Sequence, residues 1–296
     1  MKKNLTRKLA LSAAAMGVAA LSVTTTTYAW FTSNSTATAS NVSGTVRDAG
    51  EGNLLVSTDA KNWGKTATFG TNTNLLKPVH VNAAANSYTD EKGTAVTDGT
   101  KSYTVYFNIS NVAAGSSVHM KVNLSGFSDP VPQTLLADAG TSEEAKAGKT
   151  VTVGLQDVLA MNINDVAEFP TGATATKTAD ITSPLSNKAY RYKAETEVAA
   201  DAVTYYNNLL GEHISRPATG YTDQYDNTQT LMGATEEATD FTLYTLGTDQ
   251  RSAVFGLTFT FFIDGWDYQC FNAVADSLFA TGAFEFSVVA PKNQNN

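Results

Sequence analysis

The sequence predicts an all-β protein, a jelly-roll-like β-sandwich with a short helical insertion. Two segments, 103–109 and 118–124, alternate apolar and polar residues as half-buried strands do. Three further segments near the end of the chain, 241–246, 253–263 and 278–289, are rich in aromatic, β-branched and other apolar residues. Since only one stretch has convincing helical spacing, strands dominate the predicted fold.

Residues 1–29 have the three zones of a secretory signal peptide. A basic start precedes the apolar run 9–23, whose 15 residues are fewer than the roughly 20 that a bilayer-spanning helix needs. Thr27 and Ala29 are small enough for a signal peptidase site, which makes Trp30 the first mature residue. We therefore expect a secreted chain with no membrane association after cleavage; the alternative is an uncleaved membrane anchor.

The charge of the mature chain indicates which partners are unfavourable. Removing residues 1–29 takes away four of the 20 basic residues and none of the 28 acidic ones, so the net charge changes from −8 to −12. An acidic surface repels nucleic acid and anionic lipid and favours solubility after export. We therefore expect no nucleic-acid partner and a location outside the cell, in the matrix or at the cell surface.

Residues 30–47 form a distinct N-terminal extended segment. They contain no proline and almost no charge, and threonine, serine, alanine and valine dominate. These residue types favour a strand, but the weak alternation commits neither face to a core. Such a strand needs a partner sheet to satisfy its backbone groups.

Residues 48–290 are expected to form a single β-sandwich domain. Its first strands are predicted at 54–58 and 63–69, joined by a turn at Asp59, and an extended segment follows from Leu75, with Pro78 on an edge or at a strand start. Residues 82–100 are rich in small polar residues and read as a surface loop.

The alternating segments 103–109 and 118–124 are predicted to be central strands that form a hairpin through 111–117. An insertion is predicted at about 126–240, with one helix over 196–211 that ends at Gly211. The polar tail 291–296 carries no Leu-Pro-x-Thr-Gly sorting motif, so we expect no covalent attachment to a cell wall.

No residue pattern indicates catalysis, a metal centre or a cofactor. His80, His119 and His213 lack the spacing of a zinc site, and the sequence has neither a Gly-x-Ser-x-Gly elbow nor a phosphate-binding loop. His119 alternates with the apolar face of its strand, so it should face solvent. The lone Cys270, among apolar neighbours, is expected in the core rather than as a nucleophile or intermolecular bridge.

Two features invite a ligand interpretation but have a simpler one. Asp264 with Asp267, or Asp223 with Asp226, could supply oxygens to calcium, although turn-forming solvated carboxylates fit the spacing better. The aromatic residues Trp266 and Tyr268 could stack on sugars, or could close the core at the end of a strand.

The start of the chain resembles a known family. Lys2-Lys3, the alanine-rich apolar run and Tyr28-Ala29-Trp30-Phe31-Thr32 are similar to the signal and mature start of the TasA/camelysin family. Two later blocks are also similar, Val56-Ser57-Thr58-Asp59 with Asn62-Trp63, and residues 263–270, Ile-Asp-Gly-Trp-Asp-Tyr-Gln-Cys. Members are exported by Gram-positive bacteria and processed by a SipW-type signal peptidase.

The resemblance implies a jelly-roll-like sandwich whose mature N-terminal segment pairs with the next subunit in an extracellular fibre. The chain departs from the family pattern in having Asn41-Val42-Ser43-Gly44 in place of Asn-x-Phe-x-x-Gly, and in its long middle insertion. Some camelysin relatives carry a metalloprotease label, for which this chain shows no ligand set.

Three functions remain open from the sequence. The leading one is a structural subunit of a fibre or biofilm matrix, a homo-oligomer built head to tail by strand donation, with a possible matrix partner protein. The residues expected in the donated strand are Trp30, Phe31, Thr32, Thr36, Thr38, Val42 and Val46. The alternatives are a secreted adhesin or glycan-binding module, and a camelysin-like protease.

Overall fold

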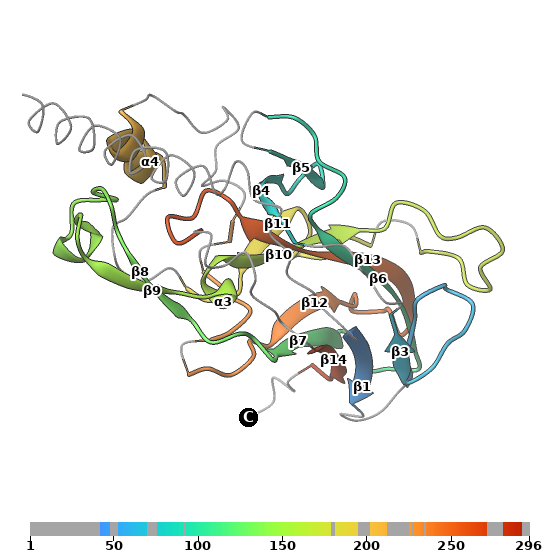
Figure 1. Ribbon diagram of the computed structural model, residues 1–296. Coiled ribbons are helices and arrows are strands. Elements are labelled where there is room, and N and C mark those ends of the chain that lie inside the picture. Colours follow the sequence, from blue (N-terminus) through green and yellow to red (C-terminus); the bar gives the residue numbers. More distant parts are fainter. Residues whose placement is uncertain are drawn as a thin grey trace, which may run out of the picture.

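The described chain folds mainly into strands that form two facing sheets (Figure 1), which confirms the predicted all-β sandwich with short helices. The computed structural model describes residues 42–47, 53–69, 76–90, 93–178, 181–194, 202–211, 225–226, 228–233, 235–270 and 281–291. The predicted signal peptide, most of the N-terminal extended segment and nearly all of the polar tail lie outside these residues.

The first sheet, called sheet A here, has five strands in the order β12-β7-β14-β1-β3. Their bounds are β12 Phe241–Thr245, β7 Ser117–Ser125, β14 Thr281–Val289, β1 Val42–Arg47 and β3 Thr66–Thr68. The strand β7 is an interior strand, with β14 and β12 antiparallel on its two sides.

The second sheet, called sheet B, has seven strands arranged around the long strand β13, Ala253–Asp264. One side of β13 carries β10 and then β11. The other side carries β6 and then β2, and past the first residue of β6, Lys101, it carries β4 and then β5. Their bounds are β10 Leu159–Asp165, β11 Lys188–Arg191, β6 Lys101–Ser110, β2 Asn53–Ser57, β4 Pro78–Asn82 and β5 Ser87–Thr89. Pro78 begins its strand, as predicted, whereas β5 falls within the stretch expected to be a loop.

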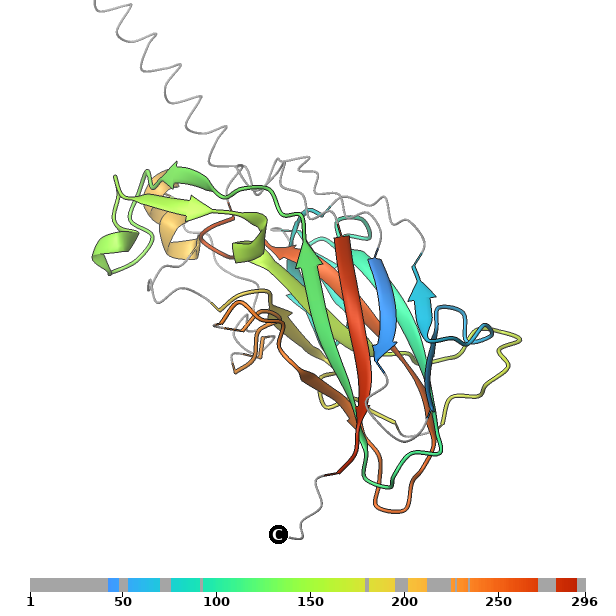
Figure 2. The same ribbon diagram turned by 90° about the horizontal axis from the view of Figure 1, so that it is seen from below.

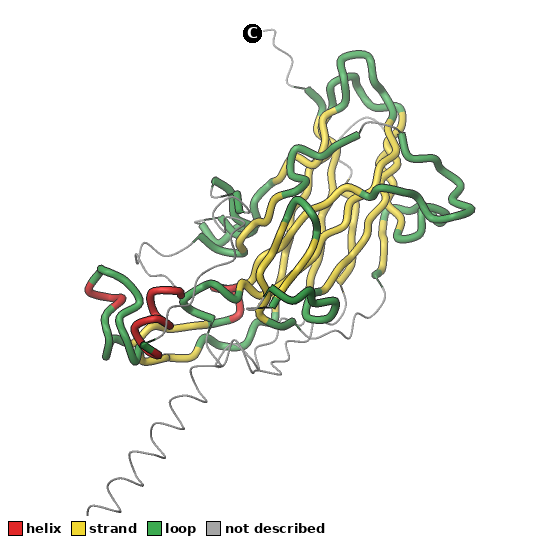
Figure 3. Tube along the Cα trace, turned by 90° about the horizontal axis from the view of Figure 1, so that it is seen from above, coloured by secondary structure: helices red, strands yellow, loops and turns green. Residues whose placement is uncertain are grey.

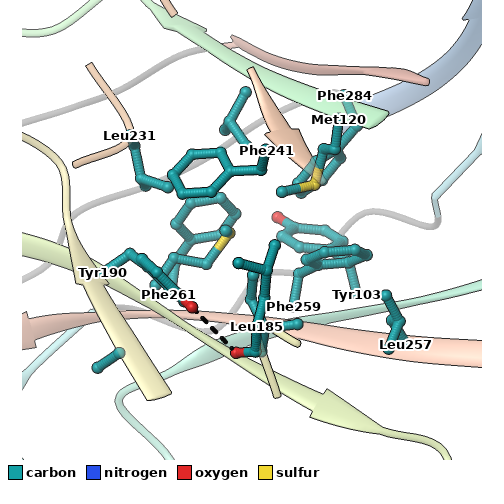
Figure 4. Packing of buried hydrophobic residues seen from close by; sticks show 14 of the residues in the cluster. Tyr103, Met120, Leu185, Tyr190, Leu231, Phe241, Leu257, Phe259, Phe261 and Phe284 are labelled. Atoms are coloured by element: carbon teal, nitrogen blue, oxygen red, sulfur yellow. Dashed lines mark hydrogen bonds between the residues drawn. The ribbon is translucent and has the colours of Figure 1, made fainter. Parts of the chain in front are cut away.

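Aromatic rings fill the space between the sheets (Figure 4). Phe284 and Phe286 of β14 meet Phe259 of β13 and Phe107 of β6, with ring centroids 4.9 Å apart in the pairs Phe259–Phe284 and Phe107–Phe286. All four side chains are at most 1% exposed. This alternation of inward rings on facing strands holds the two sheets together.

The predicted hairpin between β6 and β7 is wrong, although both strands exist and each is an interior strand of its sheet. β6 pairs with β13 and β2 in sheet B, while β7 pairs with β14 and β12 in sheet A. The connection 111–116 therefore crosses from one sheet to the other. It is held by the β12–β13 loop, where the Gly115 amide donates to the Gly247 carbonyl at 3.1 Å.

The predicted return strand after the Asp59 turn also changes sheet. Val56 and Gly64 form an isolated antiparallel bridge, after which β3 pairs with β1 in sheet A rather than with β2. Asp59 builds the turn by accepting the Lys61 and Asn62 amides at 2.9 Å each.

The predicted insertion is divided between the sandwich and a small appended unit, which we call the satellite. The strands β10 and β11 belong to sheet B. The satellite contains β8 Val131–Thr134, η1 Glu143–Ala145, β9 Thr150–Val153 and α4 Ala202–Leu210, with the one-turn helix α3 Leu155–Val158 leading back to β10. Its own small core joins Leu135, Ala202, Tyr205 and Tyr206. The part of the predicted helix that the structure describes is α4, which ends before Gly211, whose φ of +67° is a helix-terminating conformation; residues 196–201 lie outside the described residues.

The satellite and the crossing loops lie at opposite ends of the sandwich (Figures 2 and 3). We call the loops 111–116 and 246–252 the tip. β7 begins at the tip with Ser117, and its last residue Ser125 leads toward β8 of the satellite. The nine residues of β7 correspond to about 30 Å between the two ends.

Candidate functional site

The strand β1 occupies a slot between the last strand of the chain and a very short one. It runs parallel to β14 from Val42 opposite Gly282 to Arg47 opposite Ser287. On its other side it is antiparallel to β3 from Ser43 to Thr45. The first described segment of the chain therefore completes a sheet next to the segment that is described last (Figure 2).

The packing of β1 depends on a glycine. Gly44 is buried, and a Cβ at this position would lie 3.0 Å from Cε2 of Phe286 and 3.8 Å from Cε2 of Phe69. The Phe286 ring thus occupies the space that a side chain at position 44 would need. The contact between the Phe286 ring and the backbone of Gly44 therefore determines how closely β1 fits in the slot.

Five of the residues predicted for a donated strand, Trp30, Phe31, Thr32, Thr36 and Thr38, lie outside the described residues, as do Thr27 and Ala29 of the predicted cleavage site. The other two, Val42 and Val46, belong to β1. In this single chain, the end of the predicted donor segment thus pairs with the chain's own sheet.

The aromatic residues considered for sugar binding do not form an open platform. Trp266 is 2% exposed and belongs to the core between the sheets. Tyr268 is partly buried and packs against the satellite core. The core-closing interpretation therefore holds for Trp266, and its ring has no free face for a sugar to stack on.

A buried ion cluster lies beside Trp266. Nη1 of Arg191 is 3.0 Å from Oδ2 of Asp264 and 3.6 Å from Oδ2 of Asp267, and the guanidinium lies 4.2 Å from the centre of the Tyr225 ring. The three charged side chains are only 10%, 2% and 4% exposed. The expectation that these carboxylates are solvated is wrong, because both are buried against the Arg191 guanidinium, which β11 supplies.

The second oxygen of each carboxylate is also used. Oδ1 of Asp264 accepts the Trp266 amide at 3.0 Å, and Oδ1 of Asp267 accepts the Gln269 amide at 2.8 Å. The carboxylates therefore form turns, as the favoured interpretation had it, and the Arg191 guanidinium offsets one of their two negative charges. Of the second acidic pair, Asp223 lies outside the described residues, and Asp226 is 3.4 Å from Nζ of Lys188.

Cys270 follows this cluster and is 3% exposed, which places it in the core as predicted. Burial, with Asp267 and Asp264 nearby, raises the pKa of its thiol well above the ordinary value. A neutral buried thiol is a poor nucleophile.

The histidines lie apart from one another. Nδ1 of His119 is 3.1 Å from Oδ1 of Asp240 on the outer face of sheet A, where its side chain is 20% exposed. His80 is buried in β4, and His213 lies outside the described residues. Within the described ranges, no three His, Cys, Asp or Glu side chains gather in a way that could hold a metal ion.

The described part of the chain contains no helix long and apolar enough to cross a membrane. Comparisons with protein-family models, with curated proteins and with solved structures find no match for this chain.

Proposed function

We propose that this protein is a secreted, non-enzymatic structural subunit of an extracellular fibre or biofilm matrix, and that it assembles by donating residues 30–46 as a strand to another copy. The observation that carries the proposal is the position of β1 beside β14. β1 is held there by backbone pairing, and at Gly44 it has no side chain that would fill the slot.

The physical basis is that the same strand can fill the slot of its own chain or of a neighbour. If β1 leaves, the edge of β14 from Gly282 to Ser287 loses its partner and β3 loses its described pairing. Unpaired backbone edges recruit strands. An identical strand from a second copy restores the same hydrogen bonds, and repeated non-reciprocal donation produces a filament.

Export and processing fit this scheme. Cleavage after Ala29 by a SipW-type signal peptidase releases Trp30 as a free end, so that the segment becomes able to thread into another sheet only outside the cell. The mature net charge of −12 keeps unassembled copies soluble and disfavours nucleic acid. A matrix partner protein would bind at sheet edges that strand donation leaves unpaired, such as that of β12 in sheet A as the structure describes it.

Exchange is tested by cross-linking two variants that each carry one introduced cysteine in addition to the buried Cys270. Ser43 and Ala283 are directly opposite in the parallel register, and both are partly exposed. Chains that start at Trp30 and carry Ser43→Cys are mixed with chains that carry Ala283→Cys, assembled and oxidised. We expect covalent dimers, because neighbouring strands place these positions within disulfide reach only when β1 of one copy lies beside β14 of the other.

The matched control mixes Ser43→Cys with Ser287→Cys, which lies four residues farther along β14 and out of reach. Electron microscopy of the chain from Trp30, beside a chain that lacks 30–46, supplies the second readout. Equal cross-linking in both mixtures, persistent monomers of the longer chain, or fibres from both chains would each refute strand donation.

A further inference from the structure

We infer that copies linked by strand donation meet at their tips, so that the tip is the surface that contacts a second copy of the chain. This inference rests on the proposed function, since it takes the donated segment to include Val42 and Val46. It adds which ends of the two copies meet. The position of β1 and the length of its connection to β2 determine this.

The donated strand ends near the tip of the sheet that receives it. Arg47, the last residue of β1, lies opposite Ser287 of β14. Two residues farther along, Val289 lies opposite Ser117, the residue at which the tip loop enters β7. A donor chain must therefore leave the acceptor sandwich at the acceptor's tip.

The next strand begins at the tip of the donor's own sandwich. Asn53, the first residue of β2, lies opposite Ser110, which is the last residue of β6 before the tip loop 111–116. Both ends of the connection between β1 and β2 thus lie at a tip, one on each copy.

The connection is short. Residues 48–52, Asp-Ala-Gly-Glu-Gly, provide six Cα–Cα steps between Arg47 and Asn53, which span at most about 20 Å. The satellite lies about 30 Å from the tip along β7. A stack in which the satellite of one copy covers the tip of the next would stretch this connection beyond its reach.

The charges of the tip permit such a contact in an acidic protein. Among residues 111–116 and 246–252 the charged side chains are Asp249 and Arg251, both exposed. Two tips can therefore approach without like-charge repulsion, and Asp249 of one copy can face Arg251 of the other.

The contact would lie at the other end of the sandwich if only residues 30–41 were donated and β1 stayed in its own sheet. Those residues precede Val42, which lies opposite Gly282 at the satellite end of β14. That arrangement places the neighbouring copy at the satellite, so a measurement of the contact separates the two forms of donation.

The test measures energy transfer between fluorophores in assembled fibres, with one label per copy so that all transfer is between copies. Thr248→Cys labels the tip and Glu144→Cys labels the satellite, since both residues are exposed. The unsubstituted chain, with its buried Cys270, controls for stray labelling. We expect transfer between tip-labelled copies to be at least about twice as efficient as between tip-labelled and satellite-labelled copies.

Two results separate this inference from the proposal beneath it. Cross-linking of Ser43→Cys with Ala283→Cys together with stronger transfer from tip to satellite would overturn the tip contact and leave strand donation intact. Fibres without that cross-link would overturn strand donation itself.

Discussion

At the scale of single residues, Gly44 decides how tightly β1 is held. A valine at this position would place its Cβ about where the Phe286 ring makes contact, 3.0 Å away. Overpacking of this kind costs about 1–3 kcal/mol, more than the modest gain in strand propensity. We expect Gly44→Val to lower the urea midpoint and to speed hydrogen exchange along β14.

The control for this variant is Ser43→Val on the same strand. Ser43 is partly exposed, so the larger side chain should leave the free energy of unfolding within about 0.5 kcal/mol of the parent. If Gly44→Val were no more destabilising than Ser43→Val, the Phe286 contact would not set the fit of the slot.

Lys101 shows a different single-residue effect, because it is a fully buried lysine at the start of β6. Burial lowers the pKa of its ammonium group to about 8 from 10.5. Between these values the unfolded chain carries one more proton than the folded chain, so this group's contribution to stability rises as pH increases through the window. Below pH 8 the fold bears the full penalty of burying the charge.

We therefore expect Lys101→Met to stabilise the fold at pH 7 by an amount on the order of 1–3 kcal/mol, with the gain shrinking toward pH 10. Urea unfolding of both chains at a series of pH values measures the difference. Lys149→Met, at an exposed position, should leave the free energy of unfolding at pH 7 within about 0.5 kcal/mol of the parent. Destabilisation by Lys101→Met at pH 7 would mean that the interactions of the buried ammonium outweigh its loss of hydration.

At the scale of elements, the ion cluster joins β11 to the turn that ends β13. Replacing Arg191 with methionine keeps most of the side-chain volume but leaves Asp264 and Asp267 buried without the guanidinium. Breaking a buried ion pair from one side costs about 3–5 kcal/mol. We expect Arg191→Met to lower the denaturation midpoint accordingly.

Lys188→Met on the same strand is the matched control. Its partner Asp226 is 3.4 Å away, but the lysine side chain is half exposed, so the loss should be below about 1 kcal/mol. Equal losses in the two variants would contradict the view that the cluster anchors this end of the sandwich.

The elements also show how far the sequence carries. The alternation of apolar and polar residues predicted β6 and β7, because burial of one face of a strand depends on neighbouring residues of that strand, such as Val118 and Met120. Their partners could not be predicted, since the loop 111–116 has the length and glycine of a hairpin loop but crosses between sheets. Which strand pairs with which depends on contacts between residues far apart in the chain, such as Phe107 with Phe286.

The candidate site shows the same limit. The composition of 30–47 indicated an uncommitted strand, and Val42 and Val46 do lie in one. Nothing local indicates that this strand runs parallel to β14, more than 230 positions later, or that Gly44 receives the Phe286 ring. Arg191 was also missed, because β11 carries both Lys188 and Arg191, and nothing local indicates that the arginine is the one buried against two carboxylates.

At the scale of the whole molecule, the aromatic core that joins the sheets sets an upper pH limit for the fold. Burial raises the pKa of Tyr88, Tyr103 and Tyr192 to about 12. Above pH 10 these side chains lose their protons in the unfolded chain but keep them in the folded one, so stability falls as pH rises from 10 to 12.

Each of these tyrosines can remove up to about 2.7 kcal/mol over that interval, and three together approach the 5–15 kcal/mol that stabilises a typical domain. We expect one cooperative alkaline transition below pH 12, with tyrosinate absorbance and loss of the β-sheet circular dichroism signal changing together. Tyr103→Phe should shift the transition to higher pH, since burial alone accounts for the raised pKa of Tyr103 and the phenyl ring fills the same space. Gradual ionisation of these tyrosines while the β-sheet signal persists would show that hydroxide reaches the rings without unfolding, and that the core between the sheets is looser than its burial implies.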